Sequence, residues 1–159
     1  MSGFVFNPTA EATPTGPEPI VTNDGWFPDI DPAAVRKAIS VREGVLPDRL
    51  REAIVSAILS AGNDLATWAA AQQLLGHADL AAVPARVVGG ESRLLALYRR
   101  AVCAFVKAEL AERYRDNDLT AAGQRDVSEL TVAVDELRRD ARHAIRDMLG
   151  RTRTTVELL

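Results

Sequence analysis

YRRAVCAFVKAELAERYRDND, Tyr98 to Asp118, is the stretch that decides the fold. Apolar residues recur in it at three- and four-residue steps, which is the pattern of one face of an α-helix. Charged residues fill the other positions, but in no arrangement that could perform chemistry. The stretch predicts an amphipathic helix from Glu91 or Ser92 to about Arg115, and it points to assembly rather than catalysis. The expected buried face comprises Leu94, Leu97, Tyr98, Ala101, Val102, Phe105 and Ala108.

Two helices are predicted before this stretch. Asp31-Pro32 places an N-cap before a proline at the first helical position, so a short helix should run from Pro32 to about Arg42. Leu46-Pro47-Asp48 begins a long helix, which Gly76 ends and in which Gly62 marks a kink or a close crossing. Its expected buried face comprises Leu50, Ile54, Ala57 or Ile58, Ala61, Leu65, Trp68, Gln72 and Leu75.

A crossover loop is expected at His77 to Gly90, with a short turn of helix that fills the core. The apolar residues assigned to that role are Leu80, Val83, Val87 and Val88. A last long helix begins between Thr120 and Ser128, and Gly150 ends it. Its expected apolar face comprises Leu130, Val134, Leu137, Ala141, Ile145 and Met148.

The predicted fold class is all-α. Residues 26–150 are expected to form an elongated helical bundle, with three long helices plus the short N-terminal helix. Residues 1–25 are proline-rich and are expected to be an extended or disordered N-terminal arm, with Trp26 and Phe27 packing where it joins the bundle. Residues 151–159 alternate in a strand-like pattern and are expected to be an extended C-terminal tail.

Charge and cysteine content exclude several classes of protein. The formal net charge is -3, so free DNA is not expected to be the main partner. Residues 1–31 hold five acidic and no basic side chains. Cys103 is the only cysteine, which rules out an intramolecular disulfide. Neither a signal peptide nor a membrane span is apparent, and we expect a soluble protein made in the cytoplasm.

No catalytic or metal site is predicted, and no cofactor. Asp140, His143 and Asp147 could share a helix face, but zinc usually takes more nitrogen or sulfur ligands. Cys103 lies in an apolar helix without a neighbouring base, and Gly89-Gly90 precedes no Lys-Ser or Lys-Thr of a phosphate loop. These residues are interpreted as structural.

An arginine cluster near the C-terminus is the one feature of the charge pattern that exceeds background. It comprises Arg138, Arg139, Arg142, Arg146, Arg151 and Arg153, and four acidic residues interleave with it. Residues 136–159 therefore carry only +2. Two interpretations stay open: ion pairs within the helix, or an interface or DNA-facing surface.

Seven motifs then point to one family. They are FPDIDP, LPDRLREAI, DLAAVPA, GES, YRRAVCA, ERYRDND and DELRRDARHAIRDMLGR, between Phe27 and Arg151. In this order and spacing the chain, from about Trp26 to its end, resembles the head completion proteins (GpL type) of contractile-tailed temperate bacteriophages. No single motif is diagnostic, and the resemblance rests on the set.

The resemblance implies a structural virion protein of the neck, made in the host cytoplasm. Such a head-tail connector binds the portal after DNA packaging, retains the genome and offers a docking surface to the neck and tail completion protein. The implied assembly is a ring of twelve copies built from heterologous contacts, with DNA near it only in the channel. Neither catalysis nor a membrane is implied.

Within that expectation the arginine cluster divides into two candidate sites. Arg138, Arg139, Arg142 and Arg146 are candidates for a subunit-interface or channel-facing surface. The candidate portal-binding residues are Arg151, Arg153, Thr154, Thr155, Val156, Glu157, Leu158 and Leu159. The solvent-facing helix sides are expected to hide no large apolar strip, so the free chain should be a monomer or weak oligomer.

The alternative function is a small phage-encoded helical protein that binds DNA or associates with terminase. It would use the C-terminal arginine cluster on DNA. Overall acidity and the lack of a short, turn-linked helix pair with a basic second helix argue against it. An enzyme is a more distant third class.

Overall fold

The computed structural model describes residues 17–41, 45–117 and 124–151. Helices dominate this part of the chain, so the predicted all-α fold is confirmed as mainly α-helical, and the two-stranded β1–β2 sheet was not predicted. The elements in chain order are α1 (Pro32–Ile39), α2 (Pro47–Leu74), the 3-10 turn η1 (Leu80–Ala82), β1 (Val87–Val88), β2 (Glu91–Ser92), α3 (Arg93–Asn117) and α4 (Gln124–Met148).

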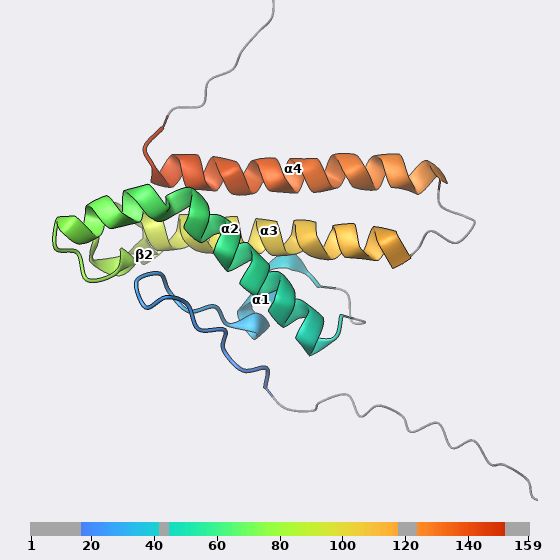
Figure 1. Cartoon of the computed structure of the whole chain (residues 1–159), viewed down its shortest axis with the longest axis horizontal. Helices are drawn as coiled ribbons and strands as arrows, with labels where there is room; N and C mark the ends of the chain where they lie inside the picture. The colour runs from blue at the N-terminus through green and yellow to red at the C-terminus, as the bar shows by residue number, and fades with distance from the viewer. Residues whose placement is uncertain (1–16, 42–44, 118–123, 152–159) are drawn as a thin grey trace, which may run out of the picture.

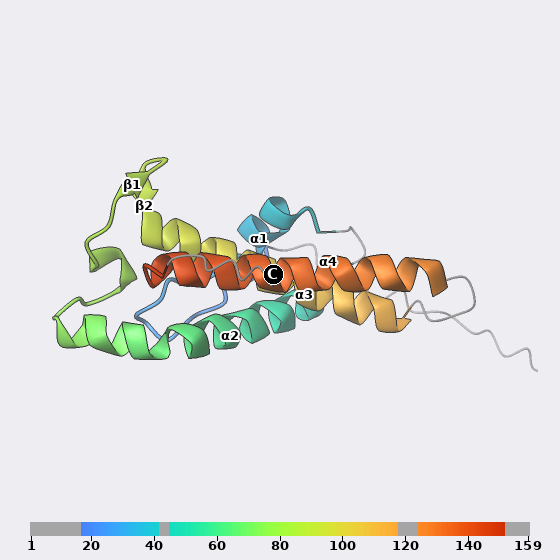
Figure 2. The same cartoon turned by 90° about the horizontal axis from the view of Figure 1, so that it is seen from above.

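The central element is α3. It runs antiparallel to α4 along its length, and α2 packs against it with little contact to α4 (Figure 1). Figure 2 shows α2 on one side of the α3–α4 pair, with α1 and the β1–β2 hairpin on the other. This arrangement leaves α2 covered on one face only.

Helix ends follow local capping rules. Asp31 caps α1, its side chain accepting a hydrogen bond from the Ala33 amide at 2.9 Å. Gly76 and Gly150 follow α2 and α4 in the left-handed conformation, at φ 90° and 67°, which confirms both predicted stops. The α1 end predicted near Arg42 was wrong, because Ser40 already adopts φ 51° and its amide donates to the Arg36 carbonyl.

The buried face of α2 follows the predicted spacing. Leu50, Ile54, Ala61 and Leu65 are fully buried, whereas Leu75, predicted to be buried, is 72% exposed. That prediction was wrong because Leu75 lies after the last turn of α2, beside the Gly76 stop. The close crossing suggested at Gly62 was also wrong, since nothing lies within 4 Å of a Cβ placed there. Figure 1 does show that α2 bends along its length.

Only part of the crossover loop contributes to the hydrophobic core. Leu80 and Val83 are buried as predicted, but Val87 and Val88 are 73% and 57% exposed. The latter two form β1, which pairs with β2 around a two-residue loop, Gly89-Gly90. Both glycines have positive φ, as a tight hairpin turn requires. The hairpin carries its valines away from the core, which the periodicity alone did not indicate.

The segment before α1 packs on the bundle. Val21 pairs with Ile30 through two backbone hydrogen bonds of 2.9 Å, and Val21 is only 2% exposed. Phe27 stacks on Tyr98 with ring centroids 4.8 Å apart. The indole N–H of Trp26 donates to the His77 carbonyl at 3.1 Å. Part of the expected arm thus lies in the core, while the domain boundaries at 25/26 and 150/151 stay predictions.

Tyr98 makes the stability of this contact depend on pH. Its ring is fully buried, and its hydroxyl accepts a hydrogen bond from the Asn23 amide at 2.8 Å. Burial raises the pKa of Tyr98 to about 12 from an ordinary value of 10.0, partly offset by the bond from Asn23. The folded state therefore favours the neutral phenol, and the contribution is complete below pH 10 and lost as pH rises toward 12.

Unfolding free energy should consequently fall by about 2 to 3 kcal/mol between pH 10 and 12 through Tyr98 alone. The Tyr98→Phe variant lacks the titrating group, so its own loss over that range should be smaller by this amount. Urea titrations at several pH values measure the difference. Parallel curves for the two proteins would contradict the assignment.

Candidate assembly surfaces

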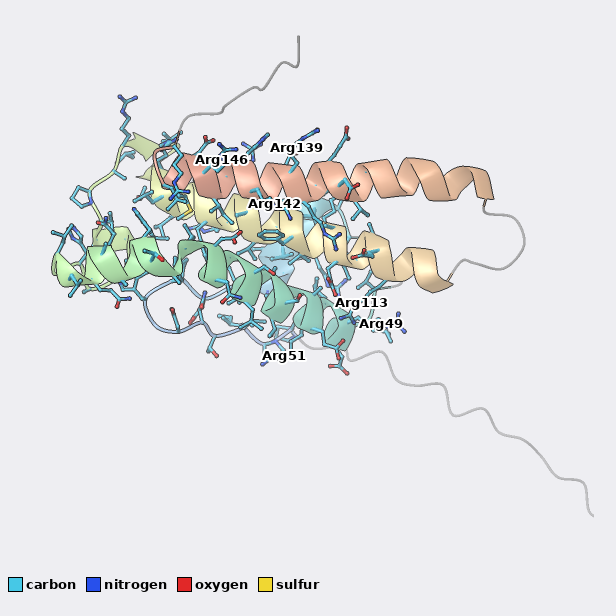
Figure 3. All side chains as sticks on the ribbon, turned by 45° about the horizontal axis from the view of Figure 1, so that its top comes forward. Arg49, Arg51, Arg113, Arg139, Arg142 and Arg146 are labelled. Carbon is cyan, nitrogen blue, oxygen red and sulfur yellow. The ribbon has the colours of Figure 1, made fainter. Side chains whose placement is uncertain are left out.

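The four α4 arginines of the cluster do not form one surface. Figure 3 shows Arg139 and Arg146 along the outer edge of α4, with Arg142 on the flank toward α2. Arg138 and Arg142 line a groove of about 370 Å³ between α2 and α4. The structure therefore brings two of the predicted residues together and leaves the other two outside the groove.

The groove has polar walls. Its α2 wall is Ser56, Ala57, Ser60, Asn63 and Asp64, its floor includes Phe105 and Glu109 of α3, and its α4 wall is Arg138 and Arg142. Arg138 is ion-paired with Glu112 of α3. Arg142 makes no ion pair with the residues that the structure describes. The groove can accept a polar or acidic group beside Arg142.

Ion pairing within α4, one of the two open interpretations of the cluster, is present at Arg139. Arg139 lies 3.7 Å from Glu136, one helical turn earlier, and both side chains are largely exposed. Arg138 pairs across helices rather than within α4. The pairing of Arg138 could not be expected from the i,i+3 and i,i+4 spacing within one helix.

A further arginine, Arg113, was not singled out in the sequence. It donates to Glu109 one turn earlier at 2.9 Å and to Glu52 of α2 at 3.0 Å. These hydrogen bonds raise the pKa of Arg113. The Glu109–Arg113 spacing was a visible signal, but the link to α2 was not. Arg113 joins α2 to α3 near the start of α2, as Figure 3 shows.

The end of α4 is firmly capped. The Arg151 amide donates to the Arg146 carbonyl at 3.0 Å and the Gly150 amide to the Asp147 carbonyl at 3.4 Å, which is the Schellman pattern. The Arg93 guanidinium also donates to the Asp147 carbonyl at 3.3 Å. Arg151 is exposed. The other predicted portal-binding residues, Arg153 to Leu159, lie outside the described residues.

A second groove opens beside this cap. It has a volume of about 590 Å³ and is bounded by the ends of α2 and α4, the start of α3 and the loop before β1. The lining residues are Trp68, Gln72, Val83, Pro84, Ala85, Arg86, Arg93, Leu94, Asp147, Met148 and Gly150. Gly150, which precedes the predicted C-terminal tail, therefore lies at the rim of a partly apolar groove.

Nothing in the described residues resembles a reactive centre. No three His, Cys, Asp or Glu side chains in this part of the chain gather as metal ligands would. Cys103 is half-buried, and burial raises the pKa of its thiol, which disfavours the thiolate. No helix among the described residues is long and apolar enough to span a membrane.

Alanine variants of Arg138 and Arg139 should differ in stability, because Arg138 pairs between helices and Arg139 pairs within α4. Arg138→Ala should lower the unfolding free energy by about 0.5 to 1 kcal/mol, because it breaks a half-buried pair between helices. Arg139→Ala should have an effect near zero, since its pair is exposed and long. Thermal and urea melts measure both. Equal losses would contradict this distinction.

Comparison with known proteins places the chain. The model of the family described as phage head completion protein (GPL) matches residues 21–159. The head completion/stabilization protein of Escherichia phage P2 is 40% identical over 143 residues, covering 90% of this chain and 85% of that protein. The probable head completion/stabilization protein of Haemophilus phage HP1 (strain HP1c1) is 26% identical over 140 residues, covering 88% and 92%. No solved structure matches significantly. The chain therefore belongs to the phage head completion protein (GPL) family.

Proposed function

We propose that this chain is a structural virion protein that completes the phage head. It binds the portal after DNA packaging, helps to retain the genome and provides a docking surface for the neck and tail. The observation that carries the proposal is the family match over residues 21–159, which includes the whole described bundle and the C-terminal tail. The P2 and HP1 relatives, named for head completion or stabilization, support it.

The described structure is compatible with a role in assembly. Its charged side chains form ion pairs between helices, as Arg138 does with Glu112 and Arg113 with Glu52. The hydrogen bond between Asn23 and Tyr98 and the stacking of Phe27 on Tyr98 hold the N-terminal segment against the bundle. We propose that the chain acts through such surfaces rather than by catalysis.

In this proposal twelve copies of the chain form a ring that follows the symmetry of the portal. The C-terminal tail, from Arg151 to Leu159, attaches to the portal. Arg138, Arg139, Arg142 and Arg146 face a neighbouring copy or the channel. The division of these arginines between a groove and an outer edge suits contacts of two kinds on each copy.

Co-sedimentation tests the proposal. The purified chain is mixed with DNA-filled heads that carry the portal, and with the same heads already completed. It should sediment with the first and stay in the supernatant with the second, whose sites are occupied. Failure to bind filled, incomplete heads would contradict the proposal.

Binding to free DNA distinguishes the alternative function. The isolated chain should bind duplex DNA weakly and lose it at moderate salt, because its net charge is -3 and Arg138 and Arg139 are already paired with Glu112 and Glu136. Tight, sequence-specific binding at physiological salt would favour the DNA-binding class.

A further inference from the structure

The α2 helix is almost free of charge along most of its length. From Ala53 to Leu75 it holds a single charged residue, Asp64, which lines the polar groove shared with α4. Surface helices normally carry charged residues on the side that faces solvent. The composition of α2 is therefore that of a helix covered on two sides, although α3 covers only one.

An exposed apolar strip runs along the uncovered side of α2. Successive members of the strip are three or four residues apart and lie opposite the buried face of α2. They are Val55, Leu59, Gly62, Ala66, Ala70 and Leu74. Val55, Leu59 and Leu74 are 39%, 61% and 89% exposed. Such a strip marks a surface that another molecule covers. The strip also shows that one expectation was wrong, namely that the solvent-facing sides of the helices contain no large apolar strip.

A second apolar group lies on the opposite side of the molecule. Val87 and Val88 in β1 are 73% and 57% exposed, and Gly89-Gly90 fixes the hairpin that presents them. Figure 2 shows this hairpin projecting on one side of the α3–α4 pair and α2 lying on the other. One copy therefore offers a projecting apolar tip, and an apolar strip faces the other way.

The charges around the two groups are complementary. Residues 59–79 contain no Lys or Arg, and Asp64 lies in the groove on the α4 side of α2. Asp79 and the carbonyl end of α2 give the end of the strip partial negative charge. The region around the hairpin, residues 86–100, holds Arg86, Arg93, Arg99 and Arg100 against Glu91. A positive surface with an apolar tip thus matches a negative surface with an apolar strip.

We infer that the β1–β2 hairpin of one copy packs across the outer face of α2 in the next copy. The small residues Gly62, Ala66 and Ala70 leave room for Val87 and Val88, while Asp79 and the carbonyl end of α2 lie toward the arginines that flank the hairpin. Because two different faces on opposite sides of the chain meet, the contact is heterologous and propagates around a ring. The inference rests on the proposed ring and names the surfaces that close it.

This contact is small. A two-residue strand tip on one helix face covers far less than the roughly 1,200 Å² of a stable interface. Copies should therefore associate weakly in dilute solution and be held together once a portal places them side by side. The contact sets the orientation of neighbours, and attachment to the portal supplies the affinity.

Cross-linking in assembled heads tests the contact. Ala66→Cys and Val88→Cys are combined in a Cys103→Ala background, and heads containing the variant are treated with a short bismaleimide, which tolerates a one-turn error in register. A ladder of covalent multimers is expected, with loss of the monomer band. Either single cysteine, and a control pair of Val88→Cys with Lys37→Cys at an exposed position of α1, should remain monomeric.

A charge substitution gives an independent readout. Val88→Asp places a charge against the apolar strip, toward the carbonyl end of α2, and should sharply reduce incorporation into heads without changing the melting temperature. The control Lys37→Asp, at an exposed position of α1 outside both surfaces, should leave incorporation unchanged. Normal incorporation of Val88→Asp, a ladder from Ala66→Cys alone, or no ladder from the double variant in heads would overturn the inference. Absence of the wild-type chain from heads would instead overturn the proposed function.

Discussion

Phe27→Ala is expected to lower the unfolding free energy by about 3 to 5 kcal/mol, the usual cost of removing a buried aromatic ring. Phe27 is 5% exposed and stacks on Tyr98 at 4.8 Å, with the rings 12° from parallel. The Phe27 ring also makes an edge-to-face contact with Trp26, with ring centroids 4.8 Å apart. Removal leaves a cavity between the N-terminal segment and α3. Urea unfolding followed by circular dichroism measures the loss.

Ile20→Ala is the matched control for Phe27→Ala. It lies in the same segment but is 58% exposed, so its replacement should change the unfolding free energy by less than about 0.5 kcal/mol. A small effect for both variants would show that the segment is not part of the folded core. A large effect for both would show that the whole segment, rather than the ring stack, carries the stability.

Helix ends were the most predictable part of the fold. Asp31, Gly76 and Gly150 act through contacts within a few residues, so their roles could be inferred without knowing what packs nearby. The α1 end differed because a serine, Ser40, took the left-handed conformation usually left to glycine. Capping chemistry is local, and sequence reasoning succeeds where the cause is local.

Burial was less predictable where it depended on how elements meet. Val87 and Val88 have the composition of core residues, yet two glycines turn the strand outward into a hairpin. Leu75 continues the spacing of α2 but lies beyond its last turn. Apolar spacing identifies a candidate face, but only the position of the neighbouring helices decides whether that face is covered.

The candidate surfaces show the same limit. The arginine cluster could be read from the sequence, but its division between a groove and an outer edge depends on where α2 lies. Arg138 pairs with a residue 26 positions away, which spacing within α4 cannot reveal. The near absence of charge from Ala53 to Leu75 is visible in the sequence and indicates a helix that is covered on more than one side.

Truncation after Arg151 is expected to abolish attachment to the portal and leave folding intact. The cut retains Arg151, whose amide caps α4 through the Arg146 carbonyl at 3.0 Å, so the helix end keeps its hydrogen bonds. The removed residues, 152–159, are rich in threonine and include Val156 and Leu158, a composition suited to adding a strand to the edge of another chain. Sedimentation with DNA-filled, portal-bearing heads should fall to background.

Two further variants separate apolar contact from charge in the same assay. Replacing Val156 and Leu158 by serine removes the apolar groups without adding charge and should abolish co-sedimentation, as truncation does. Arg153→Ala should only weaken it and increase its sensitivity to salt, since an exposed charge mainly assists encounter. Unchanged melting of all three proteins would locate the effect in attachment rather than stability. If the truncated chain still sediments with the heads, the anchor lies in the bundle, and the groove beside the α4 cap becomes the surface to mutate.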